Sequence, residues 1–395
     1  MKFYFVFLLC LAFSESGLSQ NAGGMINRPQ KTIIRKSVLT KQNDYFKYDL
    51  VYPFSEGMAA VCYNHRWGYI DKTGHEIIPC RYSYVSSFSQ GRAVVRQNSK
   101  YGYINKSGNI VIPLEYDGAL SFSDSLACVR REDKYGCVDV NGKEVIPCIH
   151  RMPIYWHDGL SQVTVRDFID KSGNKVLSLY KCESVSVFSE GFAVVKKNGK
   201  YGYIDKTGNE VIPCVYDYAA NFSEGLAYVE KNGECGFIDK TGIISFSCGF
   251  ISEGDRYFSE GRIRKMKNSK WGFLDTNGRV VIPYKYDSAK SFSDGLALVS
   301  VGWRKYGYID RKGREVIPFK YSYAFSFREG LACVQQNGKW GYINKKGQIV
   351  IPIKYDDVIT GSGQYGGYFS EGFAHVCLGR KWGFIDKLGK PLIIK

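Results

Sequence analysis

The sequence contains few residues of the kinds that usually build catalytic or metal centres. Histidine occurs only five times in 395 residues, with none of the spacings typical of metal ligands, such as His-Glu-x-x-His. No two cysteines form a Cys-x-x-Cys pair, which is the usual element of a structural zinc site. A catalytic centre needs non-repeating groups gathered at one place, and no such cluster is evident. The sequence therefore predicts no metal, no cofactor and no enzyme activity.

Long apolar runs are also missing. The longest, residues 3–13, is too short to span a bilayer, which takes about 20 residues. It follows Lys2 and precedes the more polar residues 14–20, an arrangement typical of a secretory signal peptide. We therefore expect residues 1–20 to be cleaved and the mature protein to be extracytoplasmic (secreted or periplasmic), without a transmembrane anchor. Residues 21–44 are basic and show little periodicity, which predicts a linker.

Aromatic residues and glycine are abundant. Aromatics form 15% of the chain, with 30 Tyr and 24 Phe, and there are 43 Gly. Many β-forming side chains with many turn residues favour short strands joined by tight turns. The formal net charge is +16, which is consistent either with solubility alone or with an acidic partner.

Residues 45–395 repeat with a period of about 34 residues, the signature of a tandem array. The first landmark is a turn of an aromatic residue, Ser, an acidic residue and Gly, and the acidic residue is present in nine of the ten copies. Its aromatic residues are Phe54, Phe88, Phe122, Trp156, Phe188, Phe222, Phe258, Phe292, Phe327 and Phe369. The second landmark is an aromatic residue followed by Gly. It occurs at Trp67, Tyr101, Tyr135, Tyr201, Trp271, Tyr306, Trp340 and Trp382. An Ile-Pro pair follows in seven copies.

The runs that begin at Trp67 (WGYIDK) and at Lys339 (KWGYIN) resemble the WG (KWG) repeat of bacterial proteins. The resemblance covers nearly all of residues 45–395, because the whole unit recurs rather than the Trp-Gly pair alone. The family is defined by its repeat, so the resemblance implies a repeat architecture and no particular activity.

The fifth copy explains how the unit folds. Residues 192–196 and 201–205 are rich in β-formers, and Asn198-Gly199 between them is a strong signal for a type I′ hairpin. A second turn ends at Gly208, a third strand covers residues 210–212, and Pro213 is expected to end the pairing. The sequence thus predicts an all-β fold of about ten three-stranded β-meanders. Neighbouring units must bury the faces that one sheet leaves open.

Two architectures satisfy this requirement, a closed β-propeller and an open β array. Ten blades exceed the usual four to eight, and by its sequence the array starts and stops on whole units. We therefore favour the open array.

Basic residues form the most suggestive functional pattern. The position after the Asp or Asn of the second turn is basic in eight copies, and stacking would align these side chains in a ladder. The candidate binding residues are Lys72, Lys106, Lys171, Lys206, Lys240, Arg311, Lys345 and Lys387. The ladder would suit a polyanion such as a polysaccharide or nucleic acid, or would serve only to keep exposed turns soluble. The acidic turns are expected to be hydrogen-bonded corners between units.

Copies four and six depart from the repeat. Arg166 and Cys235 replace the aromatic residue of the second landmark, and the Ile-Pro pair is absent from both copies. These places are candidates for a bend or a binding loop, or reflect ordinary drift. The sequence predicts a secreted scaffold that binds an unidentified protein or glycan through an extended surface. The alternatives are polyanion binding through the lysine ladder, and an enzyme of unknown type with its site in the irregular copies, near His150 or His157.

Overall fold

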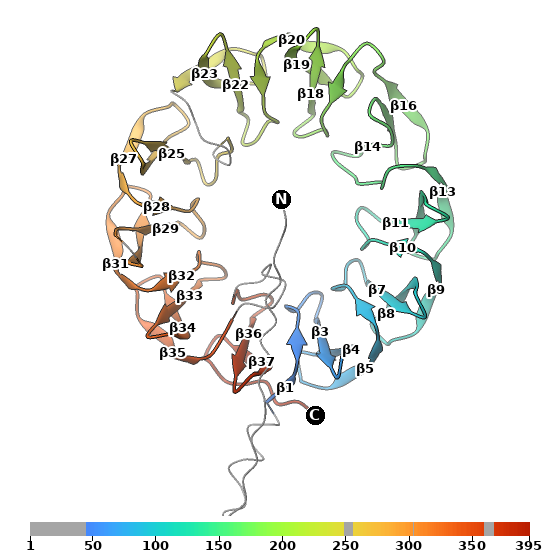
Figure 1. Ribbon diagram of the computed structural model, residues 1–395, viewed down its shortest axis with the longest axis vertical. Helices are drawn as coiled ribbons and strands as arrows, with labels where there is room; N and C mark the ends of the chain where they lie inside the picture. Colours follow the sequence, from blue (N-terminus) through green and yellow to red (C-terminus); the bar gives the residue numbers. More distant parts are fainter. Residues whose placement is uncertain (1–44, 249–255, 303, 359–366) are drawn as a thin grey trace, which may run out of the picture.

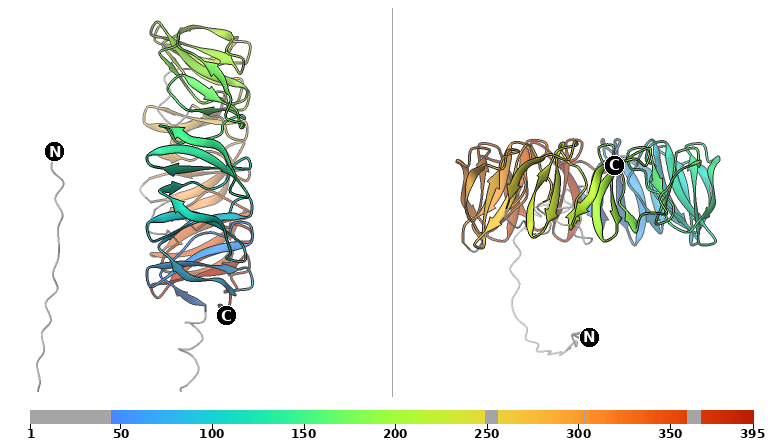
Figure 2. Two further views of the ribbon diagram at one scale, coloured as in Figure 1. Left: turned by 90° about the vertical axis from the view of Figure 1, so that its right-hand side faces the viewer. Right: turned by 90° about the horizontal axis from the view of Figure 1, so that it is seen from above.

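The computed structural model describes residues 45–248, 256–302, 304–358 and 367–395. The predicted signal peptide (1–20) and linker (21–44) lie outside the described residues. The described chain forms ten small antiparallel sheets, which are arranged as the blades of a ring one sheet deep (Figures 1 and 2). The prediction of an all-β repeat protein is confirmed, whereas the preference for an open array is wrong, because the ring is a closed β-propeller.

Seven of the described sheets have four strands in sequence order from the inner to the outer rim. The inner strands are β2 (Leu50–Val51), β6 (Tyr84–Val85), β10 (Gly118–Ala119), β17 (Ser184–Val185), β21 (Tyr218–Ala219), β28 (Ser288–Ala289) and β32 (Tyr323–Ala324). This short inner strand is missing from the predicted three-stranded unit. Two residues carry too little alternation to be recognised as a strand from the sequence.

The second strand follows the acidic turn in every blade. These strands are β3 (Met58–Tyr63), β7 (Arg92–Gln97), β11 (Leu126–Arg131), β14 (Ser161–Gln162), β18 (Phe192–Lys197), β22 (Ala227–Lys231), β25 (Ile263–Lys267), β29 (Leu296–Ser300), β33 (Leu331–Gln336) and β36 (Phe373–Leu378). The third strand carries the aromatic–Gly landmark. These strands are β4 (Arg66–Asp71), β8 (Lys100–Asn105), β12 (Lys134–Asp139), β15 (Asp167–Ile169), β19 (Lys200–Asp205), β23 (Glu234–Ile238), β26 (Lys270–Leu274), β30 (Tyr306–Asp310), β34 (Lys339–Asn344) and β37 (Lys381–Asp386).

The outer strand lies at the perimeter of the ring. These strands are β5 (Glu76–Tyr82), β9 (Ile110–Tyr116), β13 (Glu144–His150), β16 (Lys175–Ser178), β20 (Glu210–Tyr216), β24 (Ile244–Cys248), β27 (Val280–Tyr286), β31 (Glu315–Tyr321), β35 (Ile349–Tyr355) and, in the last blade, β1 (Phe46–Tyr48). Blades are numbered 1 to 10 from the one that contains β2–β5, so blade 4 is β14–β16, blade 7 is β25–β27 and blade 10 is β36, β37 and β1.

The N-terminal strand closes the ring. β1 pairs with β37, with Phe46 opposite Gly383 and Tyr48 opposite Trp382. The C-terminal end supplies only the beginning of the same outer strand, where Ile385 bridges Pro391. Each end of the array therefore contributes part of one strand, and the expectation that the array starts and stops on whole units is wrong.

The glycine of the Trp-Gly pair is required by a close approach of two strands. A Cβ atom on Gly202 would lie 2.5 Å from the carbonyl oxygen of Ile212 in the outer strand. The outer strand continues through Pro213 to Tyr216, with a shift in register against β19. Pro213 therefore interrupts the ladder without ending the strand as predicted. Because it cannot donate, a proline on the perimeter strand also hinders pairing with other chains.

The core lies between blades rather than within them. Tyr69, Ile78 and Tyr82 of blade 1 pack against Phe88 and Val95 of blade 2 in one buried cluster, with the rings of Tyr69 and Phe88 4.9 Å apart. The junction between blades 10 and 1, here called the seam, is packed in the same way, because buried residues of these two blades form a single cluster. Closure therefore buries the two faces that an open array would expose.

Candidate binding site

The eight basic residues of the predicted ladder follow the third strand of their blades. Strands alternate in direction, so this turn and the acidic turn emerge on the same face of the ring, here called the acidic-turn face. The hairpin between the second and third strands emerges on the opposite face, here called the hairpin face. The eight ladder residues therefore lie on one face of the ring, with gaps at blades 3 and 7, where Val140 and Thr276 hold the position, and they share that face with the acidic turns.

Most of the ladder is paired with carboxylates of the preceding blade. The pairs and their N···O distances are Lys72–Glu371 (2.9 Å), Lys106–Glu56 (3.4 Å), Lys171–Asp124 (3.3 Å), Lys240–Glu190 (3.1 Å), Arg311–Glu260 (2.8 Å) and Lys387–Glu329 (3.2 Å). Lys206 donates to the carbonyl oxygen of Asp158 at 2.5 Å. Lys345 has no ion pair with any described residue. The ladder is thus mainly a ring of inter-blade bonds.

The acidic turns are hydrogen-bonded corners between blades, as predicted. The carboxylate of Glu371 accepts hydrogen bonds from the N–H groups of Glu56 (2.5 Å) and Gly57 (2.9 Å), and the Ser370 hydroxyl donates to the carbonyl oxygen of Phe54. Burial would raise the pKa of Glu371, but the bonds from Lys72 and these N–H groups outweigh it and lower that pKa. The same bonds recur around the ring, so they account for the repeated acidic residue.

A second set of pairs lies on the hairpin face. The lysine that begins the third strand reaches the aspartate that directly follows the outer strand, where the chain passes to the next blade. These pairs are Lys100–Asp117, Lys200–Asp217, Lys270–Asp287, Lys339–Asp356 and, across the seam, Lys381–Asp49. The same aspartate caps the hairpin of that next blade, as where Asp117 accepts from the N–H of Glu132 at 3.0 Å. Repeated charges on both faces therefore serve mainly to join blades.

Blade 4 departs from this plan. Its hairpin has residues 163–167 where blade 5 has residues 195–202, which makes it three residues shorter. Blade 4 has no inner strand before its acidic turn. Pro153 in this segment has no N–H group to donate to a ladder, and the N–H of Ile154 donates to the Cys128 sulfur at 3.3 Å. The hairpin face is therefore less filled beside blade 3.

A hollow of about 400 Å³ opens at this place, across blades 2, 3 and 4. Its aromatic lining comes from Tyr84, Tyr101, Tyr135 and Tyr155, of which Tyr84 is 42% and Tyr155 55% exposed. Gly118, on the wall between blades 2 and 4, stands where blades 2, 6 and 9 have a tyrosine in the inner strand. A missing ring and a shortened hairpin thus leave an aromatic recess, which is the candidate site.

The polar groups of the recess come from blade 3. Asp117 lines it while paired with Lys100 at 2.6 Å. The hydrogen bond from Lys100 lowers the pKa of Asp117, so this carboxyl stays ionised. Arg130 donates to the carbonyl oxygen of Asp117 at 3.1 Å and contacts the Asp133 carboxylate at 3.4 Å. The recess therefore offers aromatic faces, a guanidinium and a carboxylate, a mixture typical of small-ligand sites.

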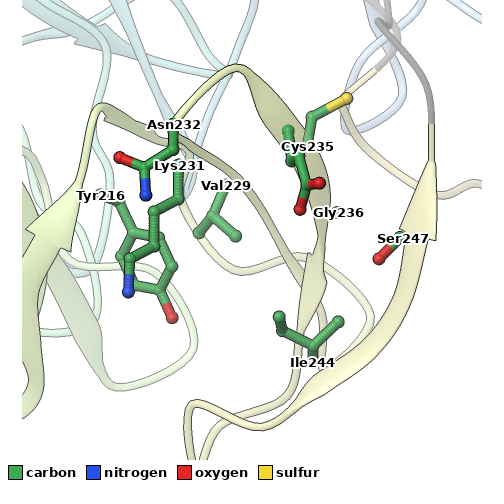
Figure 3. A pocket seen from close by; sticks show the side chains of 9 residues that line it. Tyr216, Val229, Lys231, Asn232, Cys235, Gly236, Ile244 and Ser247 are labelled. Atoms are coloured by element: carbon green, nitrogen blue, oxygen red, sulfur yellow. The ribbon is translucent and has the colours of Figure 1, made fainter.

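The second irregular copy, blade 6, borders a hollow of about 290 Å³. Figure 3 shows Tyr216 and Lys231 on one side of it and Ile244 and Ser247 on the other. Ser247 stands where regular blades have the proline of Ile-Pro. Both irregular copies therefore border hollows, but only the recess at blades 2–4 is lined by several exposed aromatic rings.

The polar cluster that departs most from the repeat surrounds Asp167, which replaces the Trp-Gly glycine of blade 4. This buried carboxylate accepts from Ser178 (2.8 Å) and Thr164 (2.9 Å) and pairs with Lys175 (3.1 Å). Burial would raise the pKa of Asp167, but these donors outweigh it and lower that pKa. Arg166 lies in the shortened turn, and the cluster fastens that turn to the outer strand.

Within the described ranges, no three His, Cys, Asp or Glu side chains come together as a metal site would require. The second-turn aspartates cap their own turns instead. Asp205 accepts from the N–H groups of Thr207 (2.9 Å) and Asn209 (3.0 Å). In the same described ranges we find no helical segment that could span a lipid bilayer.

Comparisons with solved structures and curated proteins are uninformative about function. The chain is similar to a eukaryotic initiation factor (11% identity, 76% of this chain and 94% of that one, TM-score 0.46). It is also similar to BamB from Moraxella catarrhalis (12%, 77% and 96%, 0.31) and to the extracellular domain of a hybrid two-component system from B. thetaiotaomicron (10%, 92% and 59%, 0.24). Likenesses at this level do not bear on function, and no curated protein matches the chain.

The model of the WG containing repeat matches more than half of the chain. The matched residues are 45–64, 67–101, 101–135, 168–201, 201–235, 271–302, 306–340 and 340–382. The unmatched stretches include much of blade 4 and the end of blade 6, where the landmarks are lost. Together with the recurring Trp-Gly strand and its inter-blade bonds, this match shows that the chain belongs to the WG repeat family.

Proposed function

We propose that this repeat protein is a non-enzymatic scaffold that holds a protein or glycan partner on the hairpin face, with the recess at blades 2–4 as its anchor point. One observation carries the proposal. The repeated polar groups are largely engaged between blades, whereas Tyr84 and Tyr155 remain exposed around a recess of about 400 Å³. Exposed aromatic rings in a concave site are typical of ligand anchors.

Binding of a polyanion along the lysine ladder is a weaker candidate. Six of the eight ladder residues have a carboxylate partner within 4 Å, so a polyanion would have to compete with these carboxylates. The net charge of +16 still favours acidic partners in general. We therefore assign the ladder to joining blades and the anchor to the recess.

The scaffold is proposed to work outside the cytoplasm, on the strength of the apolar run at residues 3–13 and its flanks. The polar cluster at Asp167 is assigned a structural role, because its donors converge on a single carboxylate. No group of that cluster is therefore assigned to catalysis.

The test fills the recess with the side chain that other blades carry. The full chain and its Gly118→Tyr variant are immobilised and exposed to extracts and culture medium of the source cells, at low and high salt. Retained protein and glycan are identified by mass spectrometry. We expect a partner that the parent chain retains and Gly118→Tyr loses, while Tyr257→Ala retains it. Tyr257 is a suitable control, because it occupies the repeat position of Tyr155 and is 49% exposed.

Two outcomes would contradict the proposal. One is a parent chain that retains no macromolecule above a blank surface. The other is a partner that binds Gly118→Tyr as tightly as the parent chain, because that partner would use another part of the ring. Circular dichroism of each variant checks that the β-fold is intact.

A further inference from the structure

The lysine–aspartate pairs on the hairpin face form at five joints, and the joint between blades 3 and 4 is one of those without such a pair. Lys134 begins the third strand of blade 3, where Lys100 stands in blade 2. The partner position of blade 4 is held by Arg151, where blade 3 has Asp117. Among the joints that the structure describes, this is the one at which both positions are cations.

Neither cation finds a carboxylate elsewhere in the described chain. Lys134 and Arg151 form no ion pair and no side-chain hydrogen bond with any described residue. Neither side chain is part of the lining, but Lys134 directly precedes Tyr135 and Arg151 lies two residues before Pro153, and these two neighbours line the recess. Tyr135 pairs with His150, so Lys134 and Arg151 occupy neighbouring positions at the end of the two strands. Two like charges placed together favour an anion between them.

We propose that the recess binds an acidic oligosaccharide, with sugar rings stacked on Tyr84 and Tyr155 and an anionic substituent held by Lys134 and Arg151. This inference rests on the proposed function and names its ligand class. The aromatic rings provide flat apolar faces, Asp117 accepts hydrogen bonds from sugar hydroxyls, and Arg130 donates to ring or hydroxyl oxygens. The shared chemistry is a sugar that carries a carboxylate or a sulfate.

A sugar fits these groups better than a nucleic acid does. Bases also stack on tyrosine, but a phosphodiester chain carries a charge at every nucleotide and few hydroxyl donors. Asp117, which lines the recess, and Asp133, which contacts the lining residue Arg130, would repel it. A sugar chain instead offers several hydroxyl groups for each charge, so these carboxylates contribute to its binding.

The experiment measures binding of defined probes to the full chain by isothermal titration calorimetry. The probes are tetragalacturonate, a heparin-derived tetrasaccharide, neutral maltotetraose and a single-stranded oligothymidylate. We expect at least one acidic tetrasaccharide to bind about tenfold or more tighter than maltotetraose, with an affinity that falls in about 0.5 M salt. The first two probes distinguish a carboxylate from a sulfate.

Arg151→Asp is the decisive variant, because it creates the lysine–aspartate pair that five other joints have and so should fold. We expect it to weaken the acidic sugar about tenfold or more, and Tyr155→Ala to weaken it similarly. Lys345→Ala removes from the acidic-turn face a cation that forms no ion pair with a described residue, and it should have no effect. Tyr257→Ala should have no effect either. Unchanged affinity in Arg151→Asp, or equal binding of maltotetraose, would overturn the inference.

Tighter binding of the oligothymidylate, with the same response to Arg151→Asp, would also overturn it in favour of nucleic acid. The proposed scaffold function can fail separately. If Gly118→Tyr releases a captured protein while no acidic sugar binds, the ligand class is wrong and the anchor point stands. If the parent chain captures nothing and binds no probe, both fail.

Discussion

We predict that replacing Tyr48 by alanine weakens the ring chiefly at its seam. Tyr48 lies in β1, the closing strand, which is held to β37 through only two residue pairs. Tyr82 occupies the same repeat position at the end of an outer strand that is continuous with its blade. Tyr82→Ala is therefore a matched control, which removes the same side chain from an interface that the chain itself holds together.

The magnitude follows from burial. Tyr48 is 0% and Tyr82 1% exposed, and deletion of a fully buried aromatic side chain typically costs about 3–5 kcal/mol. At Tyr48 the loss falls on the cluster in which Val51 and Phe54 pack against Trp382 and Phe384. We expect comparable losses of unfolding free energy in the two variants, but detachment of the terminal strand only in Tyr48→Ala.

The assays are denaturant unfolding, hydrogen exchange and small-angle scattering. In Tyr48→Ala, exchange should accelerate in β1 and β37, and the radius of gyration should increase as the ring opens. In Tyr82→Ala, exchange should accelerate only around blades 1 and 2. If Tyr48→Ala shows native exchange in β37 and an unchanged radius, strand β1 does not hold the ring closed, and the account of closure is refuted.

The remaining predictions concern the repeat and its charges. Gly202→Ala should cost about 1–3 kcal/mol in a denaturant titration, because its Cβ would lie 2.5 Å from the Ile212 carbonyl oxygen; Gly118→Ala, whose Cβ would meet the flexible Arg130 side chain at 3.3 Å, should cost less, and equal costs would contradict the close-approach explanation. Hydrogen bonds from Lys200 and Lys339 lower the pKa values of Asp217 and Asp356 in the folded state, so their stabilisation is present above the ordinary value of about 3.9 and disappears as the pH falls through the folded values. The denaturant midpoint of the parent chain should therefore decrease as the pH is lowered below about 4. In Asp356→Asn this decrease should be less steep. An equally steep decrease in the variant would show that the Lys339–Asp356 pair is not responsible.

The local structure of the unit could be predicted because it depends on short-range chemistry. Asn198 and Gly199 both have positive φ, +50° and +75°, as a type I′ hairpin requires. The glycine of the second turn, Gly208, lies at φ +86°. Asn and Gly are among the few residues that adopt positive φ at low cost, so their positions predicted the turns correctly. The recurrence of the aromatic–Ser–acidic–Gly turn likewise predicted hydrogen bonds between units.

Closure was missed although the sequence carries a sign of it. Residues 46–49 read Phe-Lys-Tyr-Asp, and the ends of outer strands elsewhere read Tyr-Lys-Tyr-Asp (284–287) and Ile-Lys-Tyr-Asp (353–356). The array therefore begins with the last residues of an outer strand. The first residues of the same outer strand are supplied by the C-terminal end of the chain, after Gly389. The number of repeats did not predict whether the ring closes, because closure depends on whether the two ends of the array complete one blade together.

The place of the candidate site follows from the energetics of the repeat. A residue present in every blade can be explained by a contact that every blade makes, and most ladder lysines and acidic turns are explained in this way by bonds to a neighbour. A binding group must instead remain available, so it is expected where the neighbour's matching residue is absent. Gly118 lacks the tyrosine ring of other blades, and Arg151 lacks the carboxylate that Lys134 would meet. Such losses cost inter-blade stability, which a ring of many similar interfaces tolerates at one joint, and they leave aromatic rings exposed and two cations side by side where a ligand can reach them.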